Sequence, residues 1–176
     1  LMAYFDRFPT GRYDIAGDKN YKLVTDIFKR IKVRSKIQAE ASLYDTYDVP
    51  AGERPEITAF KHFGSADLHW VILLTNNITD AYHDWPMSNS DFETFVFDKY
   101  ANPDAIHHYE VAQSSGKTTS NDFSHVLEVN SDHPGAQSVS NYEYEQRLQD
   151  EKRKIKLLQP QFLNVFIEEF DKLINR

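Results

Sequence analysis

The sequence predicts an α+β fold: a small βααβ core with an extended N-terminal arm, a β-hairpin and C-terminal helices. Three observations support this prediction. Short runs of aromatic and β-branched residues alternate with segments of helical periodicity, and Gly and Pro separate them. The 176 residues suit one domain with arms. The 12 Phe, 10 Tyr and 2 Trp supply apolar surface for a core.

Residues 1–22 are predicted to form the arm. Tyr4, Phe5, Phe8 and Tyr13 follow neither helical nor strand spacing, and Pro and Gly lie among them. A disordered tail is normally poor in aromatic residues. We therefore expect the arm to dock on its own domain or on a partner.

The core domain is predicted over residues 23–104, and its first segments are short. Residues 24–33 fit a strand or a helix, and we prefer a strand because their apolar residues share one face. Ser35 with Gln38 suits a capping box for a short helix that runs through Ala41.

A clearer strand follows over residues 43–49, which Pro50 and Gly52 end. A helix is expected next, because Pro55 suits a first-turn position and Gly64 suits a C-terminal cap.

Two consecutive helices should form the middle of this core. Ile57, Phe60 and Phe63 line one face of the first helix. The second begins at Ser65 or Asp67. Its inward residues are expected to be Leu68, Val71 and Ile72, with Leu74 as a further candidate. After the extended stretch Trp85-Pro86-Met87, Ser90 with Glu93 predicts another capping box. The apolar residues of the helix that it opens are Phe92, Phe95, Val96 and Tyr100.

Residues 105–139 are predicted to form a β-hairpin and a loop. Strands over 106–111 and 123–129 are joined by the polar stretch 113–121, and residues 131–139 read as loop.

Residues 140–176 are predicted to form the C-terminal helices. Ser140 with Glu143 makes a third capping box. The helix after it carries a narrow apolar stripe at Tyr144, Leu148, Ile155 and Leu158. So narrow a stripe indicates a helix face that packs against a partner subunit more than against the core of its own chain. Pro160 is expected to end the helix. A last helix has a broad apolar face made of Phe162, Val165, Phe166, Ile167, Phe170, Leu173 and Ile174.

Charge is segregated along the chain, whose formal net charge is −7. Residues 1–40 carry nine basic and five acidic side chains, 41–150 carry five and eighteen, and 151–176 carry six and four. The basic runs at 29–36 and 152–156 are short for nucleic-acid binding, so we favour pairing with acidic protein surfaces. The longest apolar run has five residues, and we expect no membrane span and no export leader.

Three motifs suggest phosphate binding, metal binding or acid–base catalysis, but the residues around each motif argue against that interpretation. Residues 116–118 resemble the end of a phosphate loop, but the required Gly five positions earlier is missing. His107 and His108 should point to opposite faces of a strand, and no third ligand accompanies them. His83 with Asp84 has no nucleophile in view. The chain has no cysteine. We therefore expect no catalytic residue, cofactor or metal site.

Residues 47–77 resemble a LysM module, within a LysM-like core of about residues 43–90. A wider ordered set of motifs resembles the small baseplate wedge proteins of contractile-tailed, T-even-type bacteriophages, the gene-fifty-three family. The motifs are Thr25-Asp26-Ile27-Phe28, Arg54-Pro55-Glu56, Phe63-Gly64, Leu68-His69-Trp70-Val71-Ile72-Leu73, Asn76-Asn77, Trp85-Pro86-Met87-Ser88 and Lys99-Tyr100.

This resemblance implies a non-enzymatic structural subunit of the virion that joins neighbouring baseplate wedges and inner tail components after assembly in the host cytoplasm. It implies several copies around a sixfold axis without strong self-association, and no nucleic-acid or membrane partner. A LysM-type module that binds peptidoglycan or other glycans is the alternative, and a tail-associated hydrolase using His83 or Asp84 is a third possibility.

Two sets of residues receive predicted roles. The residues expected to bind partner subunits are Tyr4, Phe5, Phe8, Leu148, Ile155, Phe162 and Phe166. The residues expected to shape and pack the core are Gly52, Pro55, Gly64, Trp70 and Trp85.

Overall fold

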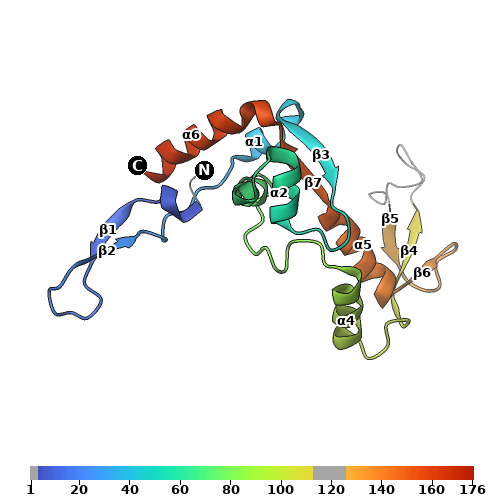
Figure 1. The fold of residues 1–176 in the computed structure, drawn as a ribbon. Helices are drawn as coiled ribbons and strands as arrows, with labels where there is room; N and C mark the ends of the chain where they lie inside the picture. The colour runs from blue at the N-terminus through green and yellow to red at the C-terminus, as the bar shows by residue number, and fades with distance from the viewer. Residues whose placement is uncertain (1–3, 113–125) are drawn as a thin grey trace. The chain divides into compact units, whose positions relative to one another are not determined.

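A computed structural model describes residues 4–112 and 126–176, and it confirms a mixed α+β fold with small antiparallel sheets (Figure 1). Its α-helices are α1 (Ser35–Gln38), α2 (Pro55–Phe63), α3 (His69–Thr75), α4 (Asn89–Lys99), α5 (Asn141–Arg153) and α6 (Leu163–Ile174). Its strands are β1 (Thr10–Tyr13), β2 (Lys22–Thr25), β3 (Tyr44–Asp48), β4 (Ile106–Ala112), β5 (Val126–Val129), β6 (Gln137–Ser140) and β7 (Lys154–Leu158). The 3₁₀ turns are η1 (Tyr4–Arg7), η2 (Ala41–Leu43), η3 (Ala66–Leu68) and η5 (Pro160–Phe162).

The described residues fall into two compact units. Unit 1 contains residues 4–86 and 153–176, and unit 2 contains 87–112 and 126–152. The predicted segments end at residues 22, 104 and 139, whereas the chain passes between the two units after residues 86 and 152. None of the helices in this described part of the chain is long and apolar enough to cross a membrane.

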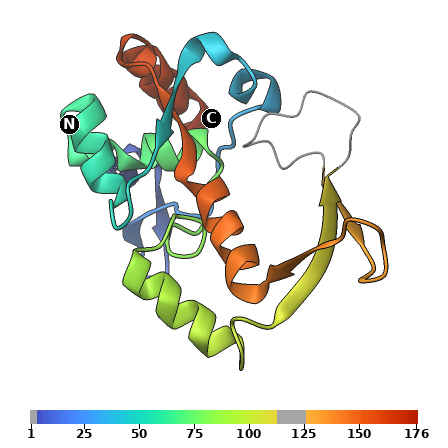
Figure 2. The same cartoon turned by 90° about the vertical axis from the view of Figure 1, so that its right-hand side faces the viewer.

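Strand β7 corrects the predicted helix that should have continued to Pro160. The helix ends at Arg153, and the next five residues pair antiparallel with β3, with Tyr47 opposite Ile155. Ile155 and Leu157 alternate with exposed lysines, so a strand buries both apolar side chains on one face. Helix α5 runs directly into this strand (Figure 2).

Helix α2 has the predicted bounds, but of the predicted inward face only Phe63 packs against the core clusters. Ile57 and Phe60 are 46% and 63% exposed, whereas Thr58 and Ala59 are buried. Helix α2 packs on α3, and Ala59 belongs to the same core cluster as Ile72. The small side chains therefore face the core, where they allow the two helices to approach closely. Leu68, Val71 and Ile72 are buried as predicted.

Two apolar clusters form the core of unit 1, and β7 contributes to both. Cluster 1 contains the buried residues Phe8, Tyr44, Leu68, Trp70, Val71, Leu158, Phe170 and Ile174. Cluster 2 contains Val49, Ala59, Ile72, Trp85, Ile155 and Leu157. Cluster 1 thus joins the N-terminal residues to α3 and α6, and cluster 2 packs α2 and α3 against the β3–β7 pair.

The N-terminal part of unit 1 also differs from its predicted elements. The strand predicted over residues 24–33 ends at Thr25, where β2 pairs with β1. A turn follows, in which the Asp26 carboxylate accepts a hydrogen bond from the Phe28 amide at 3.2 Å. Helix α1 ends at Gln38, and its N-cap is Arg34 without a side-chain cap, so the capping box predicted at Ser35 is wrong.

The other two capping boxes have different outcomes. At α4 the cap is Ser88, whose Oγ accepts a hydrogen bond from the Asp91 amide at 3.2 Å, so the predicted cap at Ser90 is wrong. At α5 the predicted box is confirmed. Ser140 Oγ accepts from the Glu143 amide at 3.2 Å, and the Glu143 carboxylate accepts from the Ser140 amide at 2.9 Å.

The sheet of unit 2 has the order β5–β4–β6. The predicted hairpin is confirmed by the antiparallel pairing of β4 with β5. Part of the predicted loop 131–139 is wrong, because β6 begins at Gln137 and pairs with the other edge of β4. The polar stretch 113–121, with the motif at 116–118, lies outside the described residues.

One buried carboxylate organises the start of α2. Glu53 accepts hydrogen bonds from the hydroxyls of Tyr47 at 2.9 Å and Thr58 at 2.8 Å, and it pairs with Lys61. The Trp85 indole donates to the Glu53 carbonyl at 2.7 Å. Burial alone would raise the pKa of this carboxyl, but the three side-chain hydrogen bonds outweigh burial and hold the pKa below its ordinary value.

We predict that Ile155→Ala lowers the free energy of unfolding by about 2–5 kcal/mol, because it leaves a cavity in cluster 2. Urea denaturation measures the change. Val165→Ala is the matched control on exposed surface, with an expected loss below about 0.5 kcal/mol. Equal small effects of both substitutions would contradict the position of β7 in the core.

We predict that Glu53→Gln destabilises the chain at neutral pH by about 1–3 kcal/mol, because Lys61 loses its charged partner. The lowered pKa of Glu53 means that its contribution is complete above the unfolded pKa of about 4.3. The contribution is lost as pH falls through the folded pKa. Urea denaturation at several pH values should therefore show the two proteins converging on acidification. Glu169→Gln, at an exposed carboxylate, should stay parallel to the parent.

Candidate partner interface

An open groove of about 620 Å³ lies on unit 1. We call residues 27–32, which form one side of it, the strap. The apolar lining residues are Tyr4, Phe5, Phe8, Ile27, Phe28, Ile31, Trp70, Leu73, Leu74 and Ile78, and the other lining residues are Lys29, Arg30, Lys32, His69, Asn77 and Thr79. The groove thus combines the N-terminal residues, the strap, and α3 with the residues that follow it.

The rim of the groove exposes large apolar side chains. Phe28 is 94% exposed, Ile27 is 63% exposed, and Phe5 is 57% exposed. Beneath this rim, Phe8 and Trp70 are buried in cluster 1. An exposed apolar rim over a packed floor is typical of a surface that another molecule covers.

The charge of the lining is of one sign. Lys29, Arg30 and Lys32 are cationic, and the described part of the chain contributes no Asp or Glu to the lining. The Lys29 ammonium donates to the Ile174 carbonyl at 3.2 Å, so it also anchors the strap on α6. Burial raises the pKa of the Tyr4 hydroxyl, and the charge of Arg30 partly offsets that shift.

The N-terminal residues are held on cluster 1 by aromatic and ionic contacts. The Trp70 ring lies 4.6 Å from Phe170 and 5.4 Å from Tyr4 between centroids. Arg7 binds both carboxylate oxygens of Asp171, at 2.7 and 3.0 Å. The buried Trp70 Nε1 finds no acceptor among the described residues. These contacts fix the floor of the groove while its rim stays open.

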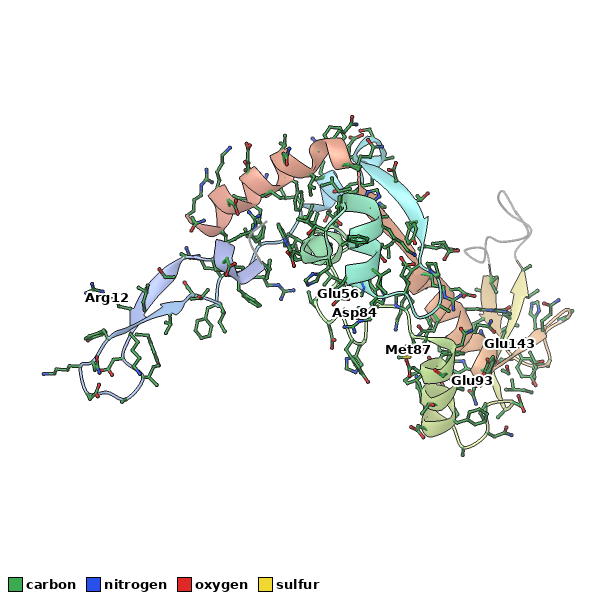
Figure 3. All side chains as sticks on the ribbon, viewed as in Figure 1. Arg12, Glu56, Asp84, Met87, Glu93 and Glu143 are labelled. Atoms are coloured by element: carbon green, nitrogen blue, oxygen red, sulfur yellow. The ribbon has the colours of Figure 1, made fainter. Side chains whose placement is uncertain are left out.

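The β1–β2 hairpin is a second exposed surface of unit 1. Its large exposed apolar residues are Tyr13, Ile15, Tyr21 and Leu23. Arg12 points outward from β1 (Figure 3). The sheet has only these two strands within the described residues, and an isolated two-stranded hairpin is marginally stable in water.

The connection between these two strands has a defined shape. The Asp14 carboxylate accepts hydrogen bonds from the amides of Lys19 and Gly17, both at 2.8 Å, and of Asp18 at 3.2 Å. These hydrogen bonds hold the pKa of the Asp14 carboxyl below its ordinary value, and the bond from the Lys19 amide has the largest effect. Lys19 adopts a φ of 66° and Gly17 a φ of 73°, as the tight turn requires.

The structure separates the residues that the sequence assigned to partner binding. Phe5 is exposed at the groove, where Tyr4 and Phe8 also lie, with Phe8 buried. Ile155 is buried in cluster 2, and Leu148 is half-buried on α5 in unit 2. Phe162 and Phe166 are half-buried against cluster 1. Of this set, the structure leaves Phe5 with most of its side chain open to solvent.

The predicted structural residues lie at turns or in the core. Pro55 is at the start of α2, and Gly64 caps its end with a φ of 78°. Gly52, in the turn after β3, also has a φ of 78°, which an L side chain rarely adopts. Trp70 and Trp85 are buried in clusters 1 and 2.

Sequence reasoning missed the buried ionic contacts of unit 2. Glu145 on α5 is 3% exposed and accepts hydrogen bonds from Lys99 and Tyr100, both at 2.7 Å. Arg147 binds both carboxylate oxygens of Glu110 on β4, at 2.8 and 3.0 Å. Burial would raise the pKa of Glu145, but the hydrogen bonds from its two partners hold it below the ordinary value.

The inward face of α5 is therefore partly polar, which apolar periodicity cannot reveal. Gln149, one turn after Glu145, is also buried and accepts a hydrogen bond from the Met87 amide at 3.2 Å. The spacing of Glu145 and Gln149 is the one signal in the sequence that could have indicated this face.

The prediction that His107 and His108 point to opposite faces of a strand is wrong. A register shift between Ile106 and His108 interrupts β4, and the Nδ1 atoms of His107 and His108 lie 2.9 Å apart instead of on opposite faces. His107 also stacks on Tyr144 at 4.0 Å. Among residues 4–112 and 126–176, no three His, Cys, Asp or Glu side chains are grouped to hold a metal ion.

His83 lies in an exposed turn. Its Nδ1 is 2.6 Å from the Asp80 carboxylate, which also accepts hydrogen bonds from the amides of Tyr82 and His83. Asp84 contacts the same turn through the Asp80 amide at 3.3 Å. The hydrogen bond from His83 is the main cause that lowers the pKa of Asp80.

Comparison with known proteins identifies the family. The family described as "Base plate wedge protein 53" matches residues 1–132 of this chain. "Baseplate wedge protein gp53" of Enterobacteria phage T4 is 28% identical over 102 residues, which cover 58% of this chain and 52% of that protein. The chain spans about half the length of this curated relative. Because the family match covers well over half of the chain, the chain belongs to the base plate wedge protein 53 family, a family of structural proteins of the phage baseplate.

Proposed function

We propose that this chain is a structural subunit of a contractile-tail baseplate wedge, which joins neighbouring wedges and inner tail components. The observation that carries the proposal is the family match over residues 1–132. That match includes the β1–β2 hairpin, the strap and helices α1 to α4. It therefore covers the parts of unit 1 that expose the most apolar surface.

Unit 1 combines a buried core with a separate exposed apolar surface, and this combination supports a role in joining other baseplate subunits. The core clusters need no partner to bury their side chains, whereas the hairpin and the rim of the groove expose large apolar residues. Such exposed surface is costly in water and becomes favourable once another subunit covers it. The chain acts in the virion, in several copies around the sixfold axis, through contacts with other baseplate subunits more than with itself.

The order β3–α2–α3–β7 supports a LysM-like core. It is a strand–helix–helix–strand arrangement, and its two strands pair antiparallel. The closing strand comes from residues 154–158 and not from the region up to residue 90. Unit 2 is inserted in the chain between the second helix and the closing strand.

We predict that Tyr13→Asp combined with Leu23→Asp lowers incorporation of the chain into phage particles about tenfold or more, because the charges prevent burial of the hairpin against a partner. Quantitative mass spectrometry of purified particles measures incorporation. The free energy of unfolding should change by less than about 1 kcal/mol, since both side chains are exposed.

Phe97→Asp is the matched control, because Phe97 is an exposed aromatic residue of α4 in unit 2. It should leave incorporation unchanged. Normal incorporation of the hairpin variant would contradict a role of the hairpin in assembly. Absence of the parent chain from purified particles would contradict the proposed function itself.

The glycan-binding alternative is tested with the purified chain and peptidoglycan sacculi. We expect no saturable retention in a sedimentation assay, because the exposed surface that the structure offers is apolar and cationic. Saturable retention, competed by soluble peptidoglycan fragments, would favour the alternative.

A further inference from the structure

We propose that the groove of unit 1 binds an acidic, amphipathic peptide segment of another baseplate subunit. The proposal rests on the proposed function for the source of the segment. The chemistry of the segment follows from the groove, whose apolar and cationic lining residues are complementary to apolar anchors flanked by carboxylates.

The apolar requirement comes from the exposed rim. Ile27 and Phe28 follow the end of β2, and neither side chain belongs to cluster 1 or cluster 2. Phe5 contacts Tyr4 and Phe8 at centroid distances of 5.1 and 5.6 Å but remains more than half exposed. A partner that places Leu, Ile or Phe side chains between these residues would remove them from water.

The charge requirement comes from two exposed cations of the strap. Lys29 is already engaged by the Ile174 carbonyl, whereas Arg30 and Lys32 are exposed. The described lining contains no carboxylate that would neutralise them. Carboxylates on the bound segment supply the missing charge, and the planar guanidinium of Arg30 suits a paired, two-bond contact with one of them.

A peptide fits this lining better than a nucleic acid or a lipid surface. Nucleic-acid binding draws most of its affinity from many phosphate contacts, and the lining is predominantly apolar with few cations. Attraction to an anionic membrane likewise needs clustered basic residues. An amphipathic helix that lays apolar residues at i, i+3, i+4 and i+7 into a groove uses both features together.

Fluorescence anisotropy of a labelled model peptide tests the proposal on the purified full chain. The probe is about 14 residues long, with Leu at the helical anchor positions and Glu at the others, and its partner carries Lys in place of every Glu. The acidic peptide should bind, and its affinity should fall as salt is added. The lysine peptide should bind about tenfold more weakly or worse.

Two variants locate the binding. Arg30→Glu combined with Lys32→Glu should weaken binding of the acidic peptide about tenfold or more, and Phe28→Ser should weaken it similarly. Phe97→Ser, at an exposed aromatic residue outside the groove, should have no effect. Each substituted side chain is exposed, so circular dichroism and urea denaturation should show an intact fold.

Three outcomes would overturn the proposal: equal binding of both peptides, binding that the groove variants do not change, and binding to a single-stranded DNA oligonucleotide or to anionic phospholipid vesicles without binding to the acidic peptide. The result is independent of the particle experiment. A chain that binds the acidic peptide but is absent from particles contradicts the proposed function, and with it a baseplate subunit as the source of the segment, but not the peptide-binding chemistry of the groove. A chain that is present in particles but ignores the peptide contradicts only the groove.

Discussion

Strand β7 is the constraint on which unit 1 depends. Its pairing with β3 places Ile155 and Leu157 in cluster 2 and Leu158 in cluster 1, so one five-residue strand secures both halves of the core. The Val49 amide extends the contact by donating to the Arg153 carbonyl at 3.0 Å. Because β3 and β7 are about a hundred residues apart in the chain, closing them costs conformational entropy that the buried apolar surface must offset. The two exposed surfaces of unit 1, the groove and the β1–β2 hairpin, depend on this closed core.

The N-terminal residues show how a stable core can hold an open surface. Phe8 is buried in cluster 1, Tyr4 packs against Trp70, and Arg7 binds Asp171 on α6. These anchors lie directly before β1, and the strap returns the chain to the core at Ile31. The hairpin between the anchors is left with its apolar side chains in solvent. The core therefore buries its side chains without a partner, while the apolar surface of the hairpin stays available to one.

Sequence reasoning was accurate at several local signals, although the capping boxes predicted at Ser35 and Ser90 were wrong, and it failed where structure depends on distant residues. Pro55 and Gly64 bound α2, and Ser140 with Glu143 opens α5, because caps and turns are chemistry within a few residues. Ile155 and Leu158 match a helical stripe, whereas Ile155 and Leu157 match the alternation of a strand, and only the distant β3 decides between the two. Glu145 is buried because Lys99 and Tyr100 reach it, which hydropathy cannot show. The groove could not be predicted from the sequence, because three separate segments form it: the N-terminal residues, the strap, and α3 with the residues that follow it. Sequence reasoning singled out Phe5 and the basic run at 29–36, but it did not place them together.

We expect the hairpin and the strap of unit 1 to be covered in the assembled baseplate while the core is unchanged. Hydrogen–deuterium exchange of the free chain and of the chain in purified baseplates tests it directly. The amides of residues 10–32 should exchange markedly more slowly in the baseplate, and those of α3 and β7 should be protected in both states. Equal exchange of residues 10–32 in the two samples would contradict the claim.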